Sequence, residues 1–244
     1  MVYRMTLTPM LEEYGKDFCL SPAGILKIFE NTAMHHASAV GDAVSDCHAR
    51  GEAWYLTDWY VEIYSRVPMG LRVKVETFCR KSRRMSGLLR DFLMQDGEGN
   101  VIARSTSRWA RVQTDTKRLL RVGEDIFAKY GAEERSVFDG GFPLSHLRQS
   151  TLPVVCEKEI ALRRNDFDMN DHVHNLVYLD YALEAIPYEA YRERKMRAFH
   201  ISYLRPICAA DRVIARRSDC EEGYAVSLEV GGEVCARVLL WMNP

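Results

Sequence analysis

The feature that most constrains the fold is an order of predicted elements that occurs twice: one amphipathic helix, then four long strands. The first helix is predicted to begin at Ser21-Pro22, a good N-cap followed by proline at the first helical position, and to stop near Gly41. The second is predicted from about residue 175 to 186, where Pro187 would end it. A helix followed by a run of antiparallel strands, twice, indicates α+β architecture with each sheet wrapped on its own helix.

Strands are predicted from alternating apolar residues bounded by glycine turns. Their ranges are 54–64, 71–79, 88–95 and 101–112 in the first half, and 199–207, 212–219, 224–230 and 233–241 in the second. The stretch between the halves is less patterned and contains Gly140-Gly141. We therefore predict an N-terminal domain over 1–135, a linker over 136–152 and a C-terminal domain over 153–244.

The two halves also echo each other in sequence. Gly99-Asn-Val-Ile-Ala-Arg104 parallels Gly232-Glu-Val-Cys-Ala-Arg237, and each stretch begins the last predicted strand of its half after a glycine turn. The same match at the same place in the same order of elements indicates an internal duplication.

Composition excludes several classes of protein. The net charge of -1 gives no reason to expect nucleic acid or an anionic membrane as a partner, and no apolar run approaches the roughly 18 residues that span a bilayer. The start of the chain does not have the pattern of a signal or transit peptide. Seven cysteines without a C-x-x-C pair suggest reduced, mostly buried thiols rather than a zinc site. We expect a cytoplasmic protein without a metal.

The densest polar cluster beside an apolar helix contains Asp168, Asn170 and His172. In an extended chain these residues, at i, i+2 and i+4, would point to one side, just before the unpaired N–H groups of the second helix. A carboxylate that activates water or attacks directly, with N–H groups that hold an oxyanion, suits attack on a carbonyl. Asp and Asn before a helix are also ordinary capping residues, and spacing alone does not decide between the two interpretations.

Residues 165–184, Asn-Asp-Phe-Asp-Met-Asn-Asp-His-Val-His-Asn-Leu-Val-Tyr-Leu-Asp-Tyr-Ala-Leu-Glu, resemble the acyl-acyl carrier protein thioesterases. The motif of that family reads roughly N-D-x-D-x-N-x-H-V-N-N-x-x-Y-x-x-W-x-x-E. Further stretches resemble other signatures of the family, so that the likeness extends in order from about residue 5 to 242. These stretches are 31–41, 61–64, 103–109 and 115–122.

The resemblance implies two tandem hotdog domains, each an antiparallel sheet around a long helix. It also implies hydrolysis of fatty acyl-acyl carrier protein to free fatty acid, with acyl carrier protein as partner and no cofactor. The first half would supply much of the acyl-chain pocket. The catalytic residues of the motif fall on Asp168, Asn170 and His172: Asp168 as base or nucleophile, Asn170 aligning it, and His172 binding and polarising the substrate. Backbone N–H groups of the substrate-binding stretch would stabilise the oxyanion; its residues are Val173, His174 and Asn175.

The sequence departs from the family at two places. The family usually has a Glu-Cys pair after the second helix, whereas a gapless match here gives Pro206-Ile207 and a one-residue slip aligns Cys208 behind Ile207. Neither match supplies a carboxylate. His174 also replaces the first asparagine of the usual pair. An acyl-coenzyme A thioesterase and a non-catalytic acyl-binding protein therefore stay as alternatives, and the chain could be a monomer or a homodimer.

Several other residues are weaker candidates. We expect Cys208 to be a core thiol, one of His35 and His36 to pack inside while the other meets solvent, and Glu184 to be structural. Phe167 and Met169 are expected to pack against the protein. Two basic clusters, 80–84 and 192–197, could meet an acidic carrier protein or simply be solvated.

Overall fold

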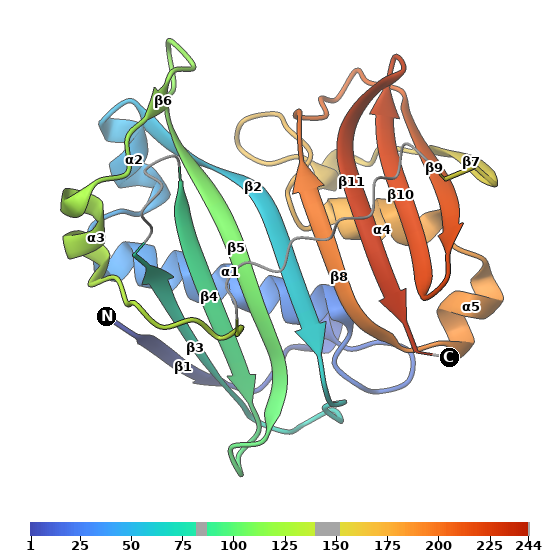
Figure 1. The fold of residues 1–244 in the computed structure, drawn as a ribbon, viewed down its shortest axis with the longest axis horizontal. Coiled ribbons are helices and arrows are strands. Elements are labelled where there is room, and N and C mark those ends of the chain that lie inside the picture. The colour runs from blue at the N-terminus through green and yellow to red at the C-terminus, as the bar shows by residue number, and fades with distance from the viewer. Residues whose placement is uncertain (82–86, 140–151, 244) are drawn as a thin grey trace. The chain divides into compact units, whose positions relative to one another are not determined.

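The computed structural model describes residues 1–81, 87–139 and 152–243, and the chain divides into two compact units, Met1–Pro143 and Leu144–Pro244 (Figure 1). We call them unit 1 and unit 2. Most of the predicted linker, 136–152, lies outside the described residues, so the predicted domain boundaries stay a prediction.

Unit 1 is an antiparallel sheet packed on the long helix α1, Pro22–Ala39. The helix begins where the sequence predicts, because the Ser21 side chain accepts a hydrogen bond from the Gly24 N–H at 2.9 Å and Pro22 follows it. In Figure 1 its strands lie in the order β1-β3-β4-β5-β2. Their bounds are Tyr3–Leu7 (β1), Val73–Arg80 (β3), Leu88–Gln95 (β4), Val101–Gln113 (β5) and Glu52–Ile63 (β2).

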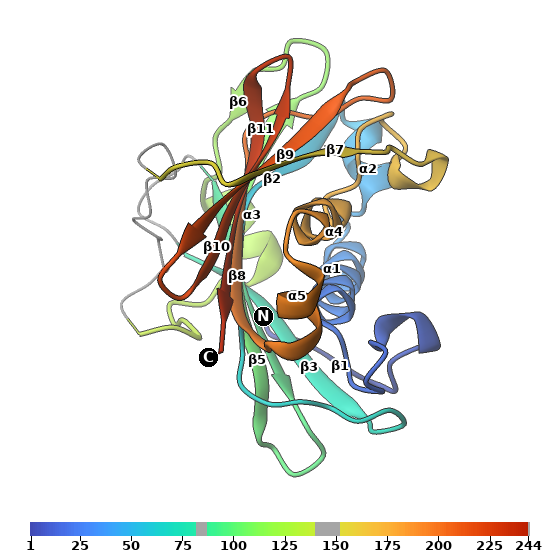
Figure 2. The same cartoon turned by 90° about the vertical axis from the view of Figure 1, so that its right-hand side faces the viewer.

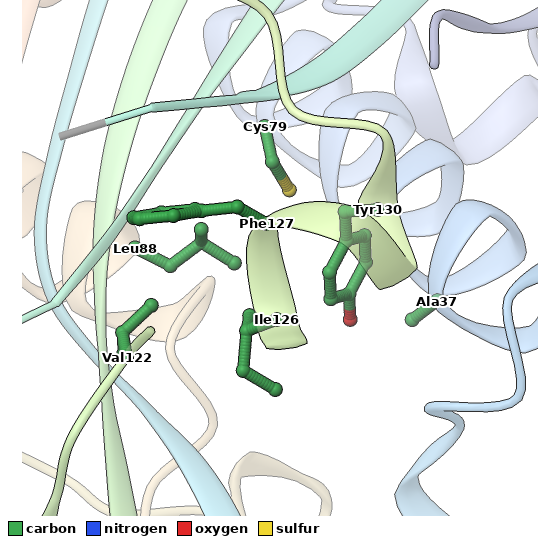
Figure 3. Close-up of a cluster of buried hydrophobic side chains, with 7 residues drawn as sticks. All are labelled: Ala37, Cys79, Leu88, Val122, Ile126, Phe127 and Tyr130. Atoms are coloured by element: carbon green, nitrogen blue, oxygen red, sulfur yellow. The ribbon is translucent and has the colours of Figure 1, made fainter. Parts of the chain in front are cut away.

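The apolar face of α1 supplies the core of unit 1. Phe29 packs on Phe92 with ring centroids 5.0 Å apart, and Phe92 in turn stacks on Trp59 of β2. A second cluster lies under the short helix α3, Glu124–Tyr130, where Phe127 and Tyr130 pack with Leu88 (Figure 3). Unit 1 also contains η1 (Leu11–Glu13), α2 (Val44–Ala49) and β6 (Leu119–Leu120), which pairs with β5.

Unit 2 repeats this arrangement around the shorter helix α4, Val177–Glu184. The strands pair in the order β8-β11-β10-β9-β7, all antiparallel, and α4 contacts β7, β9, β10 and β11 on one face of the sheet (Figure 2). Their bounds are Met196–Tyr203 (β8), Glu233–Met242 (β11), Gly223–Val230 (β10), Val213–Cys220 (β9) and Cys156–Ile160 (β7). The unit also contains η3 (Arg164–Asp166) and α5 (Tyr188–Glu193).

Both units have the predicted α+β architecture, but two predicted ranges in unit 2 are wrong at their ends. The predicted helix 175–186 begins at Val177 and stops at Glu184, and Pro187 starts a separate helix rather than ending this one. The strand predicted over 199–207 ends at Tyr203. Cys208 therefore lies outside the sheet and is exposed, not a core thiol. The edge strands β1 and β7 were not predicted, because five residues carry too little periodicity.

The structure places the repeated hexapeptides at equivalent points. In unit 1 the N–H groups of Tyr64 and Ser65 both donate to the carbonyl of Ile102. In unit 2 those of Leu204 and Arg205 both donate to the carbonyl of Cys235, the residue that matches Ile102 in the hexapeptide. The halves therefore correspond residue by residue at these strand ends, as an internal duplication predicts.

The described ranges include every cysteine, and all seven are free thiols, three of them buried. Among the described residues, none of the helices combines the length and apolar character that crossing a bilayer requires.

Candidate active site

The segment with the predicted catalytic residues is a tight turn, not the extended chain that we predicted. The Asp168 N–H donates to the carbonyl of His172 at 2.8 Å, and the Asp171 N–H donates to the carbonyl of Asp168 at 3.1 Å. Asp171 has a positive φ of 57°, a conformation that Asp tolerates better than most residues. The i, i+2, i+4 alternation therefore does not hold, because the turn reverses the chain within these five residues.

The turn brings Asp168 and Asn170 together by another route. Asp168 Oδ1 accepts the backbone N–H of Asn170 at 2.7 Å and that of His172 at 3.3 Å. The Asn170 amide nitrogen lies 3.5 Å from Asp168 Oδ2. The alternative interpretation was that Asp168 caps α4. Instead, its carboxylate stabilises the turn to which Asp168 itself belongs. Asp168 and His172 are half-buried, so both are accessible to a substrate, and Asn170 is exposed.

The predicted oxyanion donors are only partly available. The Val173 N–H already donates to the carbonyl of Ile207 at 2.8 Å, and the His174 N–H to that of Asp166 at 2.7 Å. The expectation that these two groups are unpaired is therefore wrong. The Asn175 N–H has no acceptor among residues 1–81, 87–139 and 152–243. It is the one member of the predicted set that is free to bind an oxyanion.

Sequence reasoning missed Asp166, whose buried carboxylate supports the turn by accepting hydrogen bonds. It accepts the Arg163 N–H at 2.8 Å and the Tyr181 hydroxyl at 2.6 Å. Burial acts to raise the pKa of Asp166, but the hydrogen bonds from Tyr181 and Arg163 outweigh it and hold that pKa below its ordinary value. The repeat could have revealed it, because Glu13, equally buried, accepts the Met10 N–H in the same way in unit 1.

A hollow opens on one side of this region. Asp168 is not among the residues that line it, which are Arg163, Arg164, Asn165, Asp166 and Val177.

The place of the missing family glutamate is apolar. Ile207 is fully buried, and its N–H donates to the Tyr178 hydroxyl at 3.3 Å. Cys208 pairs with His172 in an isolated antiparallel bridge, and its N–H donates to the Asp211 carboxylate at 2.6 Å. The nearest carboxylate in sequence is therefore Asp211, and it is bonded to backbone.

The same turn occurs in unit 1 without the reactive side chains. Phe18 has the positive φ that Asp171 has, and the bridge of Cys19 with Pro68 matches that of His172 with Cys208. When the two turns are aligned on these matched pairs, the unit 1 residues at the positions of Asp168, Asn170 and His172 are Gly15, Asp17 and Cys19. The carboxylate, amide and imidazole thus occur together in one of the two turns.

The histidines of α1 divide as predicted: His36 is fully buried and His35 is exposed. Glu184 forms a surface ion pair with Lys158. The expectation that Met169 packs against the protein is wrong, because it is 79% exposed at the tip of the turn.

In the second basic cluster, 192–197, two of the positive charges are paired with acidic neighbours. Residues 82–84 of the first lie outside the described residues. In the second, Arg192 pairs with Glu193 and Arg197 with Glu222. No group of three or more His, Cys, Asp or Glu side chains in the described part of the chain could hold a metal ion.

Two antiparallel sheets, each packed on its own helix, are the architecture of a tandem hotdog protein. Two family models match in order: the acyl-ACP thioesterase N-terminal domain over residues 3–130 and the acyl-ACP thioesterase C-terminal domain over residues 150–241. The chain belongs to the acyl-ACP thioesterase family.

Individual relatives agree with this assignment. Oleoyl-acyl carrier protein thioesterase 1 of Arabidopsis thaliana is 28% identical over 216 residues, which cover 83% of this chain and 59% of the relative. Dodecanoyl-[acyl-carrier-protein] hydrolase of Cinnamomum camphora is 25% identical over 99% of this chain and 68% of the relative. The chain spans about half the length of the first curated relatives that it matches.

Solved structures show the same fold. The 12:0-ACP thioesterase of Umbellularia californica matches with a TM-score of 0.86 at 23% identity, covering 100% of this chain and 97% of that one. An acyl-ACP thioesterase of Bacteroides thetaiotaomicron matches with a TM-score of 0.85 at 18% identity, covering 99% and 98%.

Proposed function

We propose that this protein hydrolyses fatty acyl-acyl carrier protein thioesters and releases free fatty acid, a reaction that ends acyl-chain elongation in fatty acid biosynthesis. The observation that carries the proposal is the match of both halves to the acyl-ACP thioesterase domain models. Asp168, Asn170 and His172 lie in the stretch of the second half that resembles the family's motif. The names of the curated relatives, which are acyl-ACP thioesterases and hydrolases, support the same substrate class.

In this proposal Asp168 is the reactive carboxylate. As a base it takes a proton from water, the hydroxide adds to the thioester carbonyl, and the pantetheine thiolate leaves and takes up that proton. As a nucleophile it would form an acyl anhydride that water then cleaves. Its two backbone hydrogen bonds hold the carboxylate in one orientation in either case. Single-turnover hydrolysis in ¹⁸O water separates the two routes, because only the anhydride route can place solvent oxygen in Asp168.

The other groups have supporting roles. Asn170 aligns the carboxylate, since its amide nitrogen lies 3.5 Å from Asp168 Oδ2. His172 binds and polarises the substrate. The Asn175 N–H stabilises the oxyanion, since the N–H groups of Val173 and His174 already donate to backbone carbonyl groups. No metal or organic cofactor enters this scheme.

The test is Asp168→Asn. Asparagine keeps an oxygen that can accept the Asn170 N–H, so the turn should persist while the base is lost. We expect kcat for fatty acid release from acyl-acyl carrier protein to fall by about a hundredfold or more. The matched control is Asp17→Asn, which removes the charge of the carboxylate in the unit 1 turn, where Asp17 accepts the Cys19 N–H. Wild-type rates in Asp168→Asn would remove this residue from the mechanism.

The identity of the carrier needs its own experiment. Matched acyl groups on acyl carrier protein and on coenzyme A should be hydrolysed faster from the protein carrier. Faster turnover of the coenzyme A thioester would favour the first alternative. Complete absence of free acid from both substrates would favour an acyl-binding protein without catalysis, an outcome that the buried Ile207 in place of an acid makes worth testing.

We also propose a cytoplasmic location and a monomer or homodimer. Seven free thiols support a reducing compartment, although the Arabidopsis thaliana and Cinnamomum camphora relatives are chloroplastic. Fractionation of the native cells tests the location, and light scattering coupled to size-exclusion chromatography tests the oligomeric state.

A further inference from the structure

Comparison of the two repeats separates side chains that the fold requires from side chains that the proposed active site requires. In unit 1 the Leu20 N–H donates to the carbonyl of Val67 at 2.8 Å, and in unit 2 the Val173 N–H donates to the carbonyl of Ile207 at the same distance. The turn before each helix is thus hydrogen-bonded to a matched residue that follows β2 in unit 1 and β8 in unit 2. A polar side chain that unit 2 has at such a junction, and unit 1 lacks, is not needed to build the fold.

Two tyrosines meet this criterion. Ser21 and His174 occupy matched positions, since both N–H groups donate to the carbonyl of the buried acid of their turn. Four residues further on, α1 has Ile25 and α4 has Tyr178. The last residue of the matched strands β2 and β8 differs in the same way: it is Ile63 in β2 and Tyr203 in β8.

The hydroxyl of Tyr178 is bonded to the backbone that supports the catalytic turn. Tyr178 is 3% exposed, and its hydroxyl oxygen accepts the Ile207 N–H at 3.3 Å. The Ile207 carbonyl accepts the N–H of Val173, which directly follows His172. One tyrosine oxygen is therefore linked, through the backbone N–H and carbonyl of the single residue Ile207, to the chain segment that contains His172.

The second tyrosine completes the support. The rings of Tyr178 and Tyr203 pack edge to face, with centroids 5.2 Å apart and planes at 75°. The Tyr203 hydroxyl donates to the carbonyl of Asn175 at 3.0 Å, which anchors the residue whose N–H is the free oxyanion donor. The matched residues of unit 1, Ile25 and Ile63, have no hydroxyl and cannot make either hydrogen bond.

The hydrogen of the Tyr178 hydroxyl is available for a further bond. In the described part of the chain it has no acceptor. Burial raises the pKa of Tyr178; the hydrogen bond from the Ile207 N–H acts to lower it and the charge of Asp168 to raise it, but burial dominates, so this hydroxyl stays protonated at neutral pH. The buried donor thus lies within the electrostatic reach of the carboxylate that the proposed mechanism uses.

We propose that Tyr178 is a positioning residue of the active site. Its hydroxyl holds the backbone of Ile207, and through it the His172–Val173 backbone, in the geometry that hydrolysis requires. This proposal rests on the proposed function for its kinetic test, and on backbone protection for a test that is independent of activity.

The kinetic test is Tyr178→Phe, which keeps the ring and removes the hydroxyl. The Ile207 N–H then loses its partner in a buried site, and the peptide should shift toward water. We expect kcat to fall by about tenfold, equivalent to about 1.4 kcal/mol in the barrier, with KM changed less than twofold. A role limited to stability would lower the melting temperature but leave kcat of the folded enzyme unchanged.

The matched control is Tyr130→Phe in unit 1. Tyr130 is equally buried, and its hydroxyl donates to Asp42 rather than to a group that supports the catalytic turn. We expect it to lower stability while kcat stays within twofold of wild type. If Tyr178→Phe has wild-type kcat, or if both variants lose the same factor in kcat, the positioning role is refuted.

Hydrogen exchange separates this proposal from the proposed function. Tyr178→Phe should speed exchange of the Ile207 and Val173 amides by about tenfold relative to Tyr130→Phe. If the wild-type protein releases no fatty acid, the proposed function fails, but the exchange result still decides whether Tyr178 holds this backbone. Unchanged exchange at both amides would overturn the positioning role whatever the activity.

Discussion

His36 should make the stability of this protein unusually sensitive to mild acid. The ring is fully buried between α1 and the sheet of unit 1, where its Nδ1 lies 2.9 Å from Arg90 Nη1. It stacks on Tyr3 and meets the edge of Tyr130. Burial lowers the pKa of His36 from 6.5 to about 3, and the positive charges of Arg90 and the N-terminal amine add to the effect.

The direction and size of the effect follow from proton linkage. Because the pKa of His36 is lower in the folded chain, the unfolded chain binds the extra proton as the pH falls below 6.5. The contribution to stability is therefore complete above that pH and is lost progressively toward the folded pKa of about 3. Between pH 7 and pH 5 the loss amounts to about 2 kcal/mol in the free energy of unfolding.

The assay is urea denaturation of wild type and of His36→Gln at both pH values. Glutamine can still accept the Arg90 hydrogen bond but does not titrate. We expect wild type to lose about 2 kcal/mol more than His36→Gln between pH 7 and pH 5. The adjacent control His35→Gln changes an exposed ring and should behave as wild type does. Equal losses in wild type and His36→Gln would refute the reasoning.

Two further predictions concern packing and buried polar groups in unit 1. Gly24→Ala should cost more than about 2 kcal/mol in urea denaturation, since a Cβ there would lie 2.2 Å from the Glu13 carbonyl oxygen, whereas Gly97→Ala meets nothing within 4 Å and should be near neutral. Asp42→Ala should cost about 3–5 kcal/mol, because it leaves the buried Tyr130 hydroxyl without its acceptor and removes an ion-pair partner of both Arg50 and Lys129; a loss below about 1 kcal/mol would contradict this.

The sequence predicts well those elements that have a long apolar periodicity and clear capping or turn residues at their ends. The helix from Pro22 was placed correctly because its cap, its proline and its apolar stripe all agree. The strand Leu88–Gln95 was predicted to the residue. Short edge strands and the end of β8 were not, since the pairing that defines them comes from chain segments far away in the sequence.

The candidate site shows the same division. Residue types and spacing single out Asp168, Asn170 and His172 as a polar cluster, but only the resemblance to the family motif favours catalysis over helix capping. Their arrangement could not be predicted, because a turn with a positive φ at Asp171 and an extended strand have the same spacing in sequence. Asp166 was missed for a related reason: its importance lies in the Tyr181 hydroxyl that reaches it from the next helix.

By itself, the sequence determined the class of fold, the duplication and the residue types at the proposed site, because these depend on local periodicity, capping and identity. Only the tertiary structure decided which N–H groups stay free and which side chains support the turn. Hydrogen bonds such as that from Ile207 to Tyr178 join segments 29 residues apart, and nothing in local sequence specifies such a pairing. It forms because both groups are buried, where an unpaired polar group is costly.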